Sequence, residues 1–287
     1  MIAVDWGSTH LRGWLLDEQG TVTDERDALV AQLPGVGFEA RLSGLTEGWP
    51  TDAPILACGM IGARHGWVEA PYVDLPLGLG RLVAGLVRAP SRRSVTVVPG
   101  LAKRGEAGRL IDVMRGEETL AIGADILPGE VALCPGTHSK WILAGPSGLE
   151  DFATFMTGEA FGLLARHSVL SQSLGEARAQ PGAAFRSGVR DALATPALIQ
   201  QLFSIRVAHL DGMQPADAAS RLSGLLIGAE ISAARNAFGE RPIVLIADGP
   251  MAALYSAALS EAGLNLSRCV PASVAAVRGL YRIWSHR

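Results

Sequence analysis

The residues best suited to chemistry stand near the start of the chain, in the segment DWGSTHLR at positions 5–12. An apolar strand directly precedes it, and Gly7 allows a ligand to approach the backbone closely. Ser8 and Thr9 offer hydroxyl and N–H donors to phosphate oxygens, and Asp5 is suited to holding Mg²⁺ through water. The pattern indicates a β-hairpin whose tip accepts a nucleoside triphosphate. A plain hairpin with a capped turn explains the same short motif equally well.

A second segment of similar design, CPGTHSKW, occupies positions 134–141 after an apolar run. Gly136 and Thr137 can meet phosphate oxygens through backbone and hydroxyl groups. Further donors follow directly in His138, Ser139 and Lys140. Two such hairpin tips facing each other would clamp a polyphosphate from both sides.

A third segment with a glycine turn follows the apolar run 243–247. Asp248 and Gly249 stand between this predicted strand and a predicted helix. A strand, a short turn and a helix N-terminus form a suitable platform for an adenine base and its sugar.

Candidate acceptor-binding residues lie in the glycine-rich loop 59–72. Arg64 is suited to a carboxylate, because its guanidinium is planar and can donate two parallel hydrogen bonds. Trp67 fits either a substrate wall or the core, and His65 is more typical of a surface or packed histidine. Glu117 and Glu118 begin a predicted helix after a glycine, where carboxylates also interact favourably with the helix dipole.

Composition favours a compact protein with a small-molecule partner. The chain has 287 residues, of which 48% are hydrophobic, and a chain of this length is expected to form two lobes. Its net charge is -3, and it contains no basic stripe that would bind a nucleic acid. The three cysteines lack the spacing of a zinc site or disulfide framework. No membrane partner or apolar span is indicated, which predicts a cytoplasmic protein. Apolar helices leave open whether it forms a homodimer.

Strands and helices must hold these segments in place. Apolar runs predict strands at 2–4, 11–15, 53–58, 95–98, 110–113, 131–133 and 243–247, and helical spacing predicts helices at 197–210, 223–234 and 272–284. The run GVGFEA at 35–40 superficially matches a dinucleotide fingerprint. No buried strand precedes it, so a nicotinamide site is not expected.

The order of the motifs resembles the sugar-kinase, hsp70 and actin superfamily, and within it the 2-dehydro-3-deoxygalactonokinase family. The strings CGMIGARHGWVEAPY, DVMRGEET and PGTHSKW carry the resemblance most specifically, and it extends from end to end of the chain. It implies an α/β protein with the two-lobed actin-like ATPase (ribonuclease H-like) fold and an interlobe cleft. Residues 1–113, joined by the C-terminal helix 272–287, would form one lobe, and residues 114–271 the other.

The resemblance also implies a reaction and roles for residues. ATP with Mg²⁺ would phosphorylate the terminal (6-) hydroxyl of 2-dehydro-3-deoxy-D-galactonate, in galactonate breakdown. Glu117 matches the place of the general base in related kinases, with Asp112 and Glu118 as reserves. Arg12 and Lys140 would stabilise charge on the transferred group, and Arg64, Trp67 and Arg115 would hold the sugar acid. Asp5 would serve the metal.

Two alternatives remain at the level of the sequence. The acceptor could be another keto-deoxy sugar acid such as 2-dehydro-3-deoxygluconate, since one placed donor can distinguish the epimers. A nucleotide-binding sensor or filament-forming relative would keep the nucleotide site without the chemistry, but it would leave the loop 59–72 without a purpose.

Overall fold

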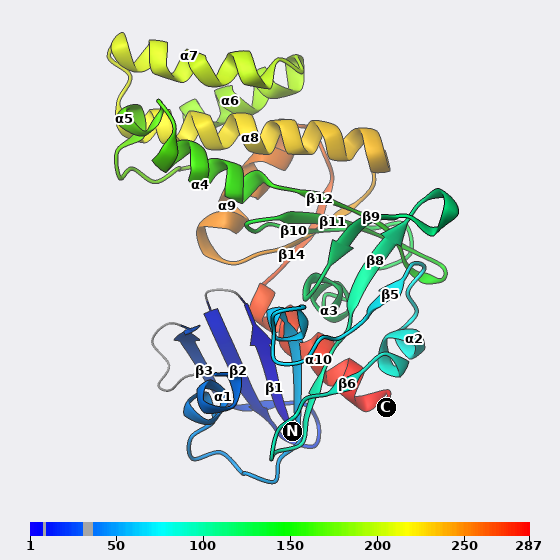
Figure 1. The fold of residues 1–287 in the computed structure, drawn as a ribbon. Helices are drawn as coiled ribbons and strands as arrows, with labels where there is room; N and C mark the ends of the chain where they lie inside the picture. Colours follow the sequence, from blue (N-terminus) through cyan, green and yellow to red (C-terminus); the bar gives the residue numbers. More distant parts are fainter. Residues whose placement is uncertain (8–9, 31–36) are drawn as a thin grey trace. The chain divides into compact units, whose positions relative to one another are not determined.

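The computed structural model describes residues 1–7, 10–30 and 37–287. The chain divides into two compact units, and Figure 1 labels most of their helices and strands. Unit 1 comprises Met1–Pro128, Ala144–Phe152 and Ala272–Arg287, and unit 2 comprises Gly129–Leu143 and Ala153–Pro271. This division differs from the boundary expected after residue 113, because residues 114–128 make their contacts within unit 1. Among the described residues, no helix is long and apolar enough to cross a membrane.

The larger sheet of unit 1 contains six strands in the order β3-β2-β1-β4-β7-β6. Their bounds are β1 Ile2–Trp6, β2 His10–Leu16, β3 Val22–Leu29, β4 Ile55–Gly59, β6 Val87–Arg88 and β7 Val95–Val97. Strands β1, β2 and β3 pair antiparallel, whereas β4 runs parallel to β1 and β7 parallel to β4. Buried aliphatic side chains of β1, β4 and β7 form the core of this unit, because both faces of these central strands are covered.

A smaller sheet and several helices complete unit 1. The three-stranded sheet has the order β5-β8-β9, with β5 Tyr72–Asp74, β8 Gly100–Arg104 and β9 Leu110–Met114. The helices are α1 Phe38–Leu45, α2 Leu79–Ala84, α3 Glu117–Gly123 and α10 Ala272–Ser285, with short 3₁₀ turns at Met60–Gly62 and Glu106–Gly108. Strand β8 lies between the strands predicted at 95–98 and 110–113, at residues for which the sequence indicates no strand.

Helices α3 and α10 pack with their backbones in close contact. A Cβ added at Gly123 would lie 1.8 Å from the carbonyl oxygen of Ala275, and one at Gly279 would lie 2.1 Å from that of Thr119. Each helix therefore uses a glycine where the other helix passes. This contact fixes α3, and with it the carboxylates at its first turn.

The second large sheet contains five strands in the order β12-β11-β10-β13-β14, and its strands belong to unit 2 except for the end of β11 and most of β12, which are assigned to unit 1. The strands are β10 Val131–Cys134, β11 Ser139–Gly145, β12 Gly148–Phe155, β13 Ile243–Ile246 and β14 Leu266–Val270. Strand β10 is antiparallel to β11 and parallel to β13, which is parallel to β14. The helices are α4 Thr157–His167, α5 Ser171–Leu174, α6 Ala183–Ala194, α7 Leu198–Leu210, α8 Pro215–Phe238 and α9 Gly249–Glu261.

The two sheets repeat one topology. In each sheet, the first strand in sequence (β1 or β10) lies between the second (β2 or β11) and a parallel strand (β4 or β13). The third strand (β3 or β12) lies beside the second at one edge, and a further strand (β7 or β14) lies beside β4 or β13. The corresponding orders are β3-β2-β1-β4-β7 and β12-β11-β10-β13-β14. This repeat confirms the α/β class with the duplicated, actin-like ATPase (ribonuclease H-like) fold that the resemblance implies.

Candidate functional site

The candidate metal ligand of unit 1 lies near the end of β1. The register of the parallel strands β1 and β4 places Asp5 beside Cys58, and the Cys58 thiol donates to Asp5 Oδ1 at 3.8 Å. Parallel strands end at a common edge of a sheet, and loops at that edge carry ligand contacts in α/β proteins. Asp5 therefore stands where such a site is expected, next to the first hairpin turn.

The first turn of α3 brings two more carboxylates to this region of unit 1. Gly116 precedes the helix with φ 106, a conformation that favours glycine, and a Cβ there would lie 3.4 Å from the Cα of Gly59. The Glu117 carboxylate accepts the backbone N–H of Arg115 at 3.1 Å. The Glu118 carboxylate accepts the N–H of Gly116 at 2.8 Å. Glu118 is fully buried and Glu117 only partly, so of these two Glu117 is the more accessible to a substrate.

The three carboxylates influence one another electrostatically. Burial raises the pKa of Asp5, the Arg12 cation lowers it, and the charge of Glu117 raises it further. Burial and the neighbouring Glu117 together raise the pKa of Glu118 to about 7. Burial, with the charges of Asp5 and Glu118, raises the pKa of the Cys58 thiol well above its ordinary value. This part of unit 1 is thus a confined negative region in which a cation would be stabilised.

The raised pKa of Glu118 predicts a pH-dependent stability. Between its ordinary value of 4.5 and about 7, the folded protein binds more protons at Glu118 than the unfolded chain does. The stabilisation is therefore complete below about pH 4.5 and is lost as the pH rises through 7.

Relative to wild type, Glu118→Gln should gain up to about 3 kcal/mol of unfolding free energy between about pH 4.5 and about pH 8. Urea titrations across this range measure the change, and Glu106→Gln, at an exposed position, should show none. A constant difference between Glu118→Gln and wild type would contradict the expectation.

The residues of the first hairpin turn are only partly described. The N–H of Gly7 donates to the carbonyl of His10 at 2.9 Å, which closes the turn, whereas Ser8 and Thr9 lie outside the described residues. Arg12 lies opposite Asp5 on β2, and its Nε donates to Asp27 at 3.3 Å. The structure therefore brings Arg12 near Asp5 while a second carboxylate also binds its guanidinium.

Arg115 is the candidate sugar-acid ligand with the most distinctive surroundings. Its Nη2 donates to the carbonyl of Ala70 at 2.9 Å, and its guanidinium lies 4.5 Å from the centre of the Tyr72 ring. Nε and Nη1 are buried and have no hydrogen-bond partner within the described ranges. Buried guanidinium N–H groups are costly to leave unpaired, so Arg115 retains donor capacity beyond its contact with Ala70. Gly62 lies directly beside Nη1, since a Cβ there would approach it to 2.9 Å.

The other candidates of unit 1 are more dispersed. Arg64 is exposed on the loop after β4, and the Trp67 ring stacks on Phe38 at 6.2 Å, so core packing accounts for at least part of its position. The reserve carboxylate Asp112 lies in β9 opposite Lys103 and accepts the N–H of its neighbour Val113 at 2.8 Å.

In unit 2, the candidate phosphate loop follows β10 and packs against the start of α4. The N–H of Glu159 donates to the carbonyl of Thr137 at 2.9 Å. A Cβ at Gly158 would lie 2.3 Å from the carbonyl oxygen of Gly136, so only glycine permits this approach. The His138 imidazole and the Glu159 carboxylate form a hydrogen bond on the exposed side of the loop. The exposed Gly136 and Thr137 are thus held beside a helix N-terminus, which favours anions.

Two further polar residues of this hairpin are buried. Lys140 is buried, and its Nζ donates to the carbonyl of His138 at 2.9 Å. Ser139 is completely buried, and its hydroxyl lies 3.0 Å from the Tyr255 hydroxyl. The Ser139 side chain therefore belongs to the interior of unit 2.

A cavity of about 470 Å³ in unit 2 borders this loop. Its lining is mostly apolar with a few polar groups, as in sites for small molecules. The lining residues are Gly136, Thr137, Thr157, Gly158, Phe161, Ala177, Arg178, Ala179, Ser223, Leu226, Ile227, Met251, Leu254 and Tyr255. The exposed Asp248 and Gly249 begin helix α9, which supplies the last three of these residues.

Sequence reasoning missed a buried polar network behind this cavity. Glu230 on α8 accepts the indole N–H of Trp141 and the hydroxyl of Tyr255, both at 2.8 Å. The signal in the sequence was a single charged residue within the apolar run 223–234. Its partners lie far away in sequence, so the run alone does not reveal them.

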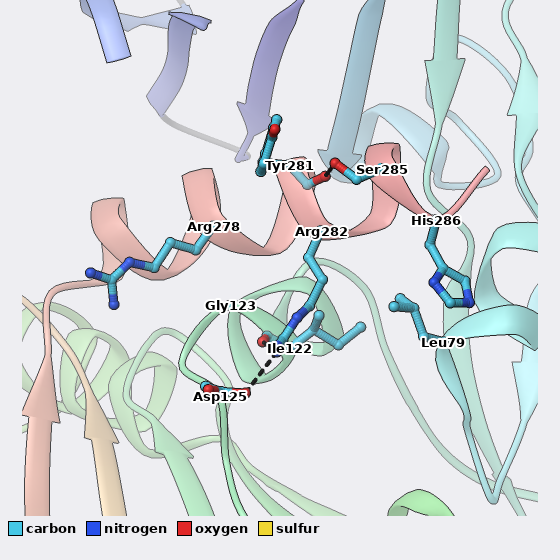
Figure 2. Close-up of a pocket in the computed structure, with 9 residues that line it drawn as sticks. All are labelled: Leu79, Ile122, Gly123, Asp125, Arg278, Tyr281, Arg282, Ser285 and His286. Atoms are coloured by element: carbon cyan, nitrogen blue, oxygen red, sulfur yellow. Dashed lines mark hydrogen bonds and ion pairs between the residues drawn. The ribbon is translucent and has the colours of Figure 1, made fainter. Parts of the chain in front are cut away.

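A second cavity, of about 500 Å³, lies in unit 1 between α10 and the C-terminal end of α3 (Figure 2). Arg282 crosses it and donates to Asp125 Oδ1 at 2.8 Å, whereas Arg278 points away. It is separated by the length of α3 from Glu117, which begins that helix. This cavity is therefore distinct from the carboxylates at the first turn.

Comparisons with known proteins match the whole length of the chain. The sequence model of the family described as 2-keto-3-deoxy-galactonokinase matches residues 5–283. A Rhizobium meliloti (strain 1021) protein, provisionally named 2-dehydro-3-deoxygalactonokinase DgoK1, is 40% identical over 97% of this chain and 94% of its own. The 2-dehydro-3-deoxygalactonokinase of Escherichia coli (strain K12) is 35% identical over 93% of this chain and 91% of its own.

A solved structure agrees with these sequence matches. It is a Sinorhizobium meliloti protein provisionally assigned as a 2-dehydro-3-deoxygalactonokinase, 37% identical to this chain. The alignment covers 99% of this chain and 95% of that one, with a TM-score of 0.90. Sequence and backbone thus point to the same group of proteins.

Proposed function

The chain belongs to the 2-keto-3-deoxy-galactonokinase family, and from this we propose that it is an ATP-dependent carbohydrate kinase acting on 2-dehydro-3-deoxy-D-galactonate. The acceptor would be the terminal (6-) hydroxyl of this sugar acid, and the reaction would serve galactonate breakdown. One structural observation carries the proposal. Asp5, Glu117 and Arg115 lie in one region of unit 1. Two buried guanidinium nitrogens of Arg115 have no hydrogen-bond partner among the described residues.

Glu117 is the proposed general base. A carboxylate that accepts the hydroxyl proton as the phosphoryl group arrives makes the acceptor oxygen a better nucleophile. Its hydrogen bond from the Arg115 N–H holds it at the start of α3, and its partial exposure leaves it accessible to a hydroxyl. Glu118 is less suited, because it is fully buried and accepts hydrogen bonds from Gly116 and Thr119.

Arg115 and Arg64 are proposed to bind the sugar-acid carboxylate, with Trp67 beside them. Replacing Arg115 by Lys should raise the KM for the sugar acid by about 10–100-fold with a smaller change in kcat, because lysine keeps the charge but loses the fork of donors. Steady-state kinetics with the sugar acid varied at saturating ATP measure the effect. Arg109→Lys, at an exposed position, is the matched control. An unchanged KM for the sugar acid in Arg115→Lys would remove it from the site.

In unit 1, Gly7, Ser8 and Thr9 of the first turn are proposed ligands of nucleotide phosphates. In unit 2, Gly136, Thr137 and His138 of the second turn are proposed for the same role. The cavity of unit 2 suits the nucleotide base, with Asp248 and Gly249 at the start of α9 nearby. Arg12 and Lys140 would stabilise charge on the transferred group.

Asp5 is the proposed contact for Mg²⁺. The described residues contain no cluster of three or more side chains that could hold a metal, and this fits Mg²⁺, which is commonly bound by one or two carboxylates, water and nucleotide phosphates. When bound, Mg²⁺ neutralises charge on the phosphate oxygens. The contribution of Asp5 is a fixed carboxylate at the end of β1, next to the turn.

Assaying ADP release with ATP and each of the two epimeric keto-deoxy sugar acids tests the proposal. We expect turnover with the galactonate epimer and a much lower kcat/KM with the gluconate epimer. The reverse preference would assign the chain to the other acceptor. Nucleotide binding without a phosphorylated product from either epimer would favour a non-catalytic sensor or filament-forming role. We also propose a cytoplasmic location. A homodimer would be detected by light scattering in the same preparations.

A further inference from the structure

The buried carboxylate of Glu230 lies at the centre of a hydrogen-bonded network in unit 2. Its side chain is 3% exposed, and its two oxygens accept from Trp141 and Tyr255. The Tyr255 hydroxyl donates to Glu230, and the Ser139 hydroxyl lies 3.0 Å from that of Tyr255. Ser139 and Tyr255 thus both belong to the network around Glu230.

This network joins the elements that border the cavity of unit 2. Ser139 and Trp141 lie in β11 directly after the candidate phosphate loop, and Tyr255 lies in α9. A side-chain hydrogen bond from Thr157, the first residue of α4, also lowers the pKa of Glu230. Thr157 and Tyr255 both line the cavity. Glu230 does not line it, but it accepts hydrogen bonds from these two lining residues.

A carboxylate at this position is costly for the fold alone. Burial raises the pKa of Glu230, and the hydrogen bonds from Thr157, Trp141, Tyr255 and Ser139 oppose that shift. Buried ionic groups commonly contribute no more stability than apolar residues of the same volume, whereas a fully satisfied network fixes one arrangement of its partners. The apolar surroundings of Glu230 on α8, including Ile227 and Ile231, would accommodate an apolar side chain. The arrangement therefore points to a role other than stability.

We propose that Glu230 is a positioning residue for the nucleotide phosphates. Through Tyr255, Ser139 and Thr157 it holds the starts of β11 and α4 in place. These two elements fix Gly136 and Thr137, whose backbone and hydroxyl donors face a triphosphate. The proposal rests on the proposed function for the identity of the ligand.

Two substitutions separate positioning from shape. Glu230→Gln can keep both hydrogen bonds of this side chain. The amide oxygen would accept from Trp141, and the amide nitrogen would donate to the Tyr255 oxygen, which reverses the direction of the second hydrogen bond. Glu230→Met fills the volume but accepts no hydrogen bond from either partner. We expect Glu230→Met to raise the KM for ATP and the Kd for ADP by about tenfold or more, with the KM for the sugar acid unchanged. Glu230→Gln should stay within about threefold of wild type, which would be rescue by the conservative variant.

A third variant and a control keep the test decisive. Tyr255→Phe removes a hydroxyl that donates to Glu230, and it should weaken ADP binding even if Glu230→Met does not fold. Glu130→Gln breaks a buried ion pair with Arg268 of 2.6 Å at the other end of β10, and it should leave the Kd for ADP unchanged. Calorimetric titration with ADP measures Kd, and thermal unfolding reports stability separately.

The outcomes distinguish this inference from the proposed function. Unchanged ADP binding in folded Glu230→Met and Tyr255→Phe overturns the positioning role, even if the wild type phosphorylates the sugar acid. An equal rise in the KM for both substrates also overturns it, since it would indicate a general structural effect. A wild type that binds ADP through this network but phosphorylates neither epimer contradicts the proposed function alone.

Discussion

Replacing Glu117 by Gln is expected to reduce kcat by about 10²–10⁴-fold, the usual contribution of a positioned general base. The amide keeps the size of the side chain and an acceptor for the Arg115 N–H, so the start of α3 should remain intact. It cannot accept a proton from the acceptor hydroxyl. The Kd for ADP should stay close to that of wild type, because the nucleotide contacts proposed for unit 2 do not involve Glu117. A coupled assay of ADP release and a calorimetric titration measure the two quantities.

Matched variants show whether Glu117 or a reserve carboxylate is the base. Asp112→Asn and Glu118→Gln should each retain most of the turnover, and Glu106→Gln, which changes an exposed carboxylate of unit 1, should retain all of it. Nearly normal turnover in Glu117→Gln would end its assignment. A large loss in Glu118→Gln instead would favour the buried carboxylate whose pKa is raised to about 7, a value well matched to proton transfer near neutral pH.

Gly123→Ala should produce the largest loss of stability among these variants. The new Cβ would lie 1.8 Å from a carbonyl oxygen of α10, and backbone atoms cannot rotate away as a flexible side chain would. Overpacking commonly costs 1–3 kcal/mol, and a clash between two backbones belongs at or above the upper end, about 3 kcal/mol. Urea unfolding followed by circular dichroism measures this change.

The control for Gly123→Ala is Gly80→Ala. Gly80 is also helical, in α2, but a Cβ there would meet nothing within 4 Å. Alanine should stabilise this helix by about 0.5–1 kcal/mol, because it loses less conformational freedom on folding than glycine does. Equal unfolding free energies for Gly123→Ala and wild type would show that α3 and α10 can separate at little cost.

The sequence predicts the strands that carry the candidate loops, and the structure confirms them. Runs such as 2–4 and 131–133 are continuous and apolar, since both faces of a central strand are buried. Strand β14 was missed because its residues alternate between partly buried and exposed, and Arg268 interrupts its apolar character. Arg268 donates a hydrogen bond to Glu130, which lies 138 residues earlier in the sequence, so this ion pair can be identified only from the fold.

The candidate site shows the same limit. Glycine, hydroxyl and carboxylate residues next to predicted strand ends could be identified one segment at a time. The unpartnered nitrogens of Arg115 and the network of Glu230 depend on contacts between distant segments; Trp141 and Glu230 are 89 residues apart. Local patterns therefore identified candidate residues, while three-dimensional contacts indicated which side chains are already committed to other partners.

The contribution of α10 to unit 1 has a consequence for synthesis on the ribosome. Unit 2 is complete when Pro271 has been added, whereas unit 1 still lacks the helix against which Gly123 packs. At elongation rates of roughly 5–20 residues per second, the start of unit 1 would wait on the order of tens of seconds for this helix. Unit 2 would thus be complete before α10 emerges to pack against α3, the helix that begins at Glu117.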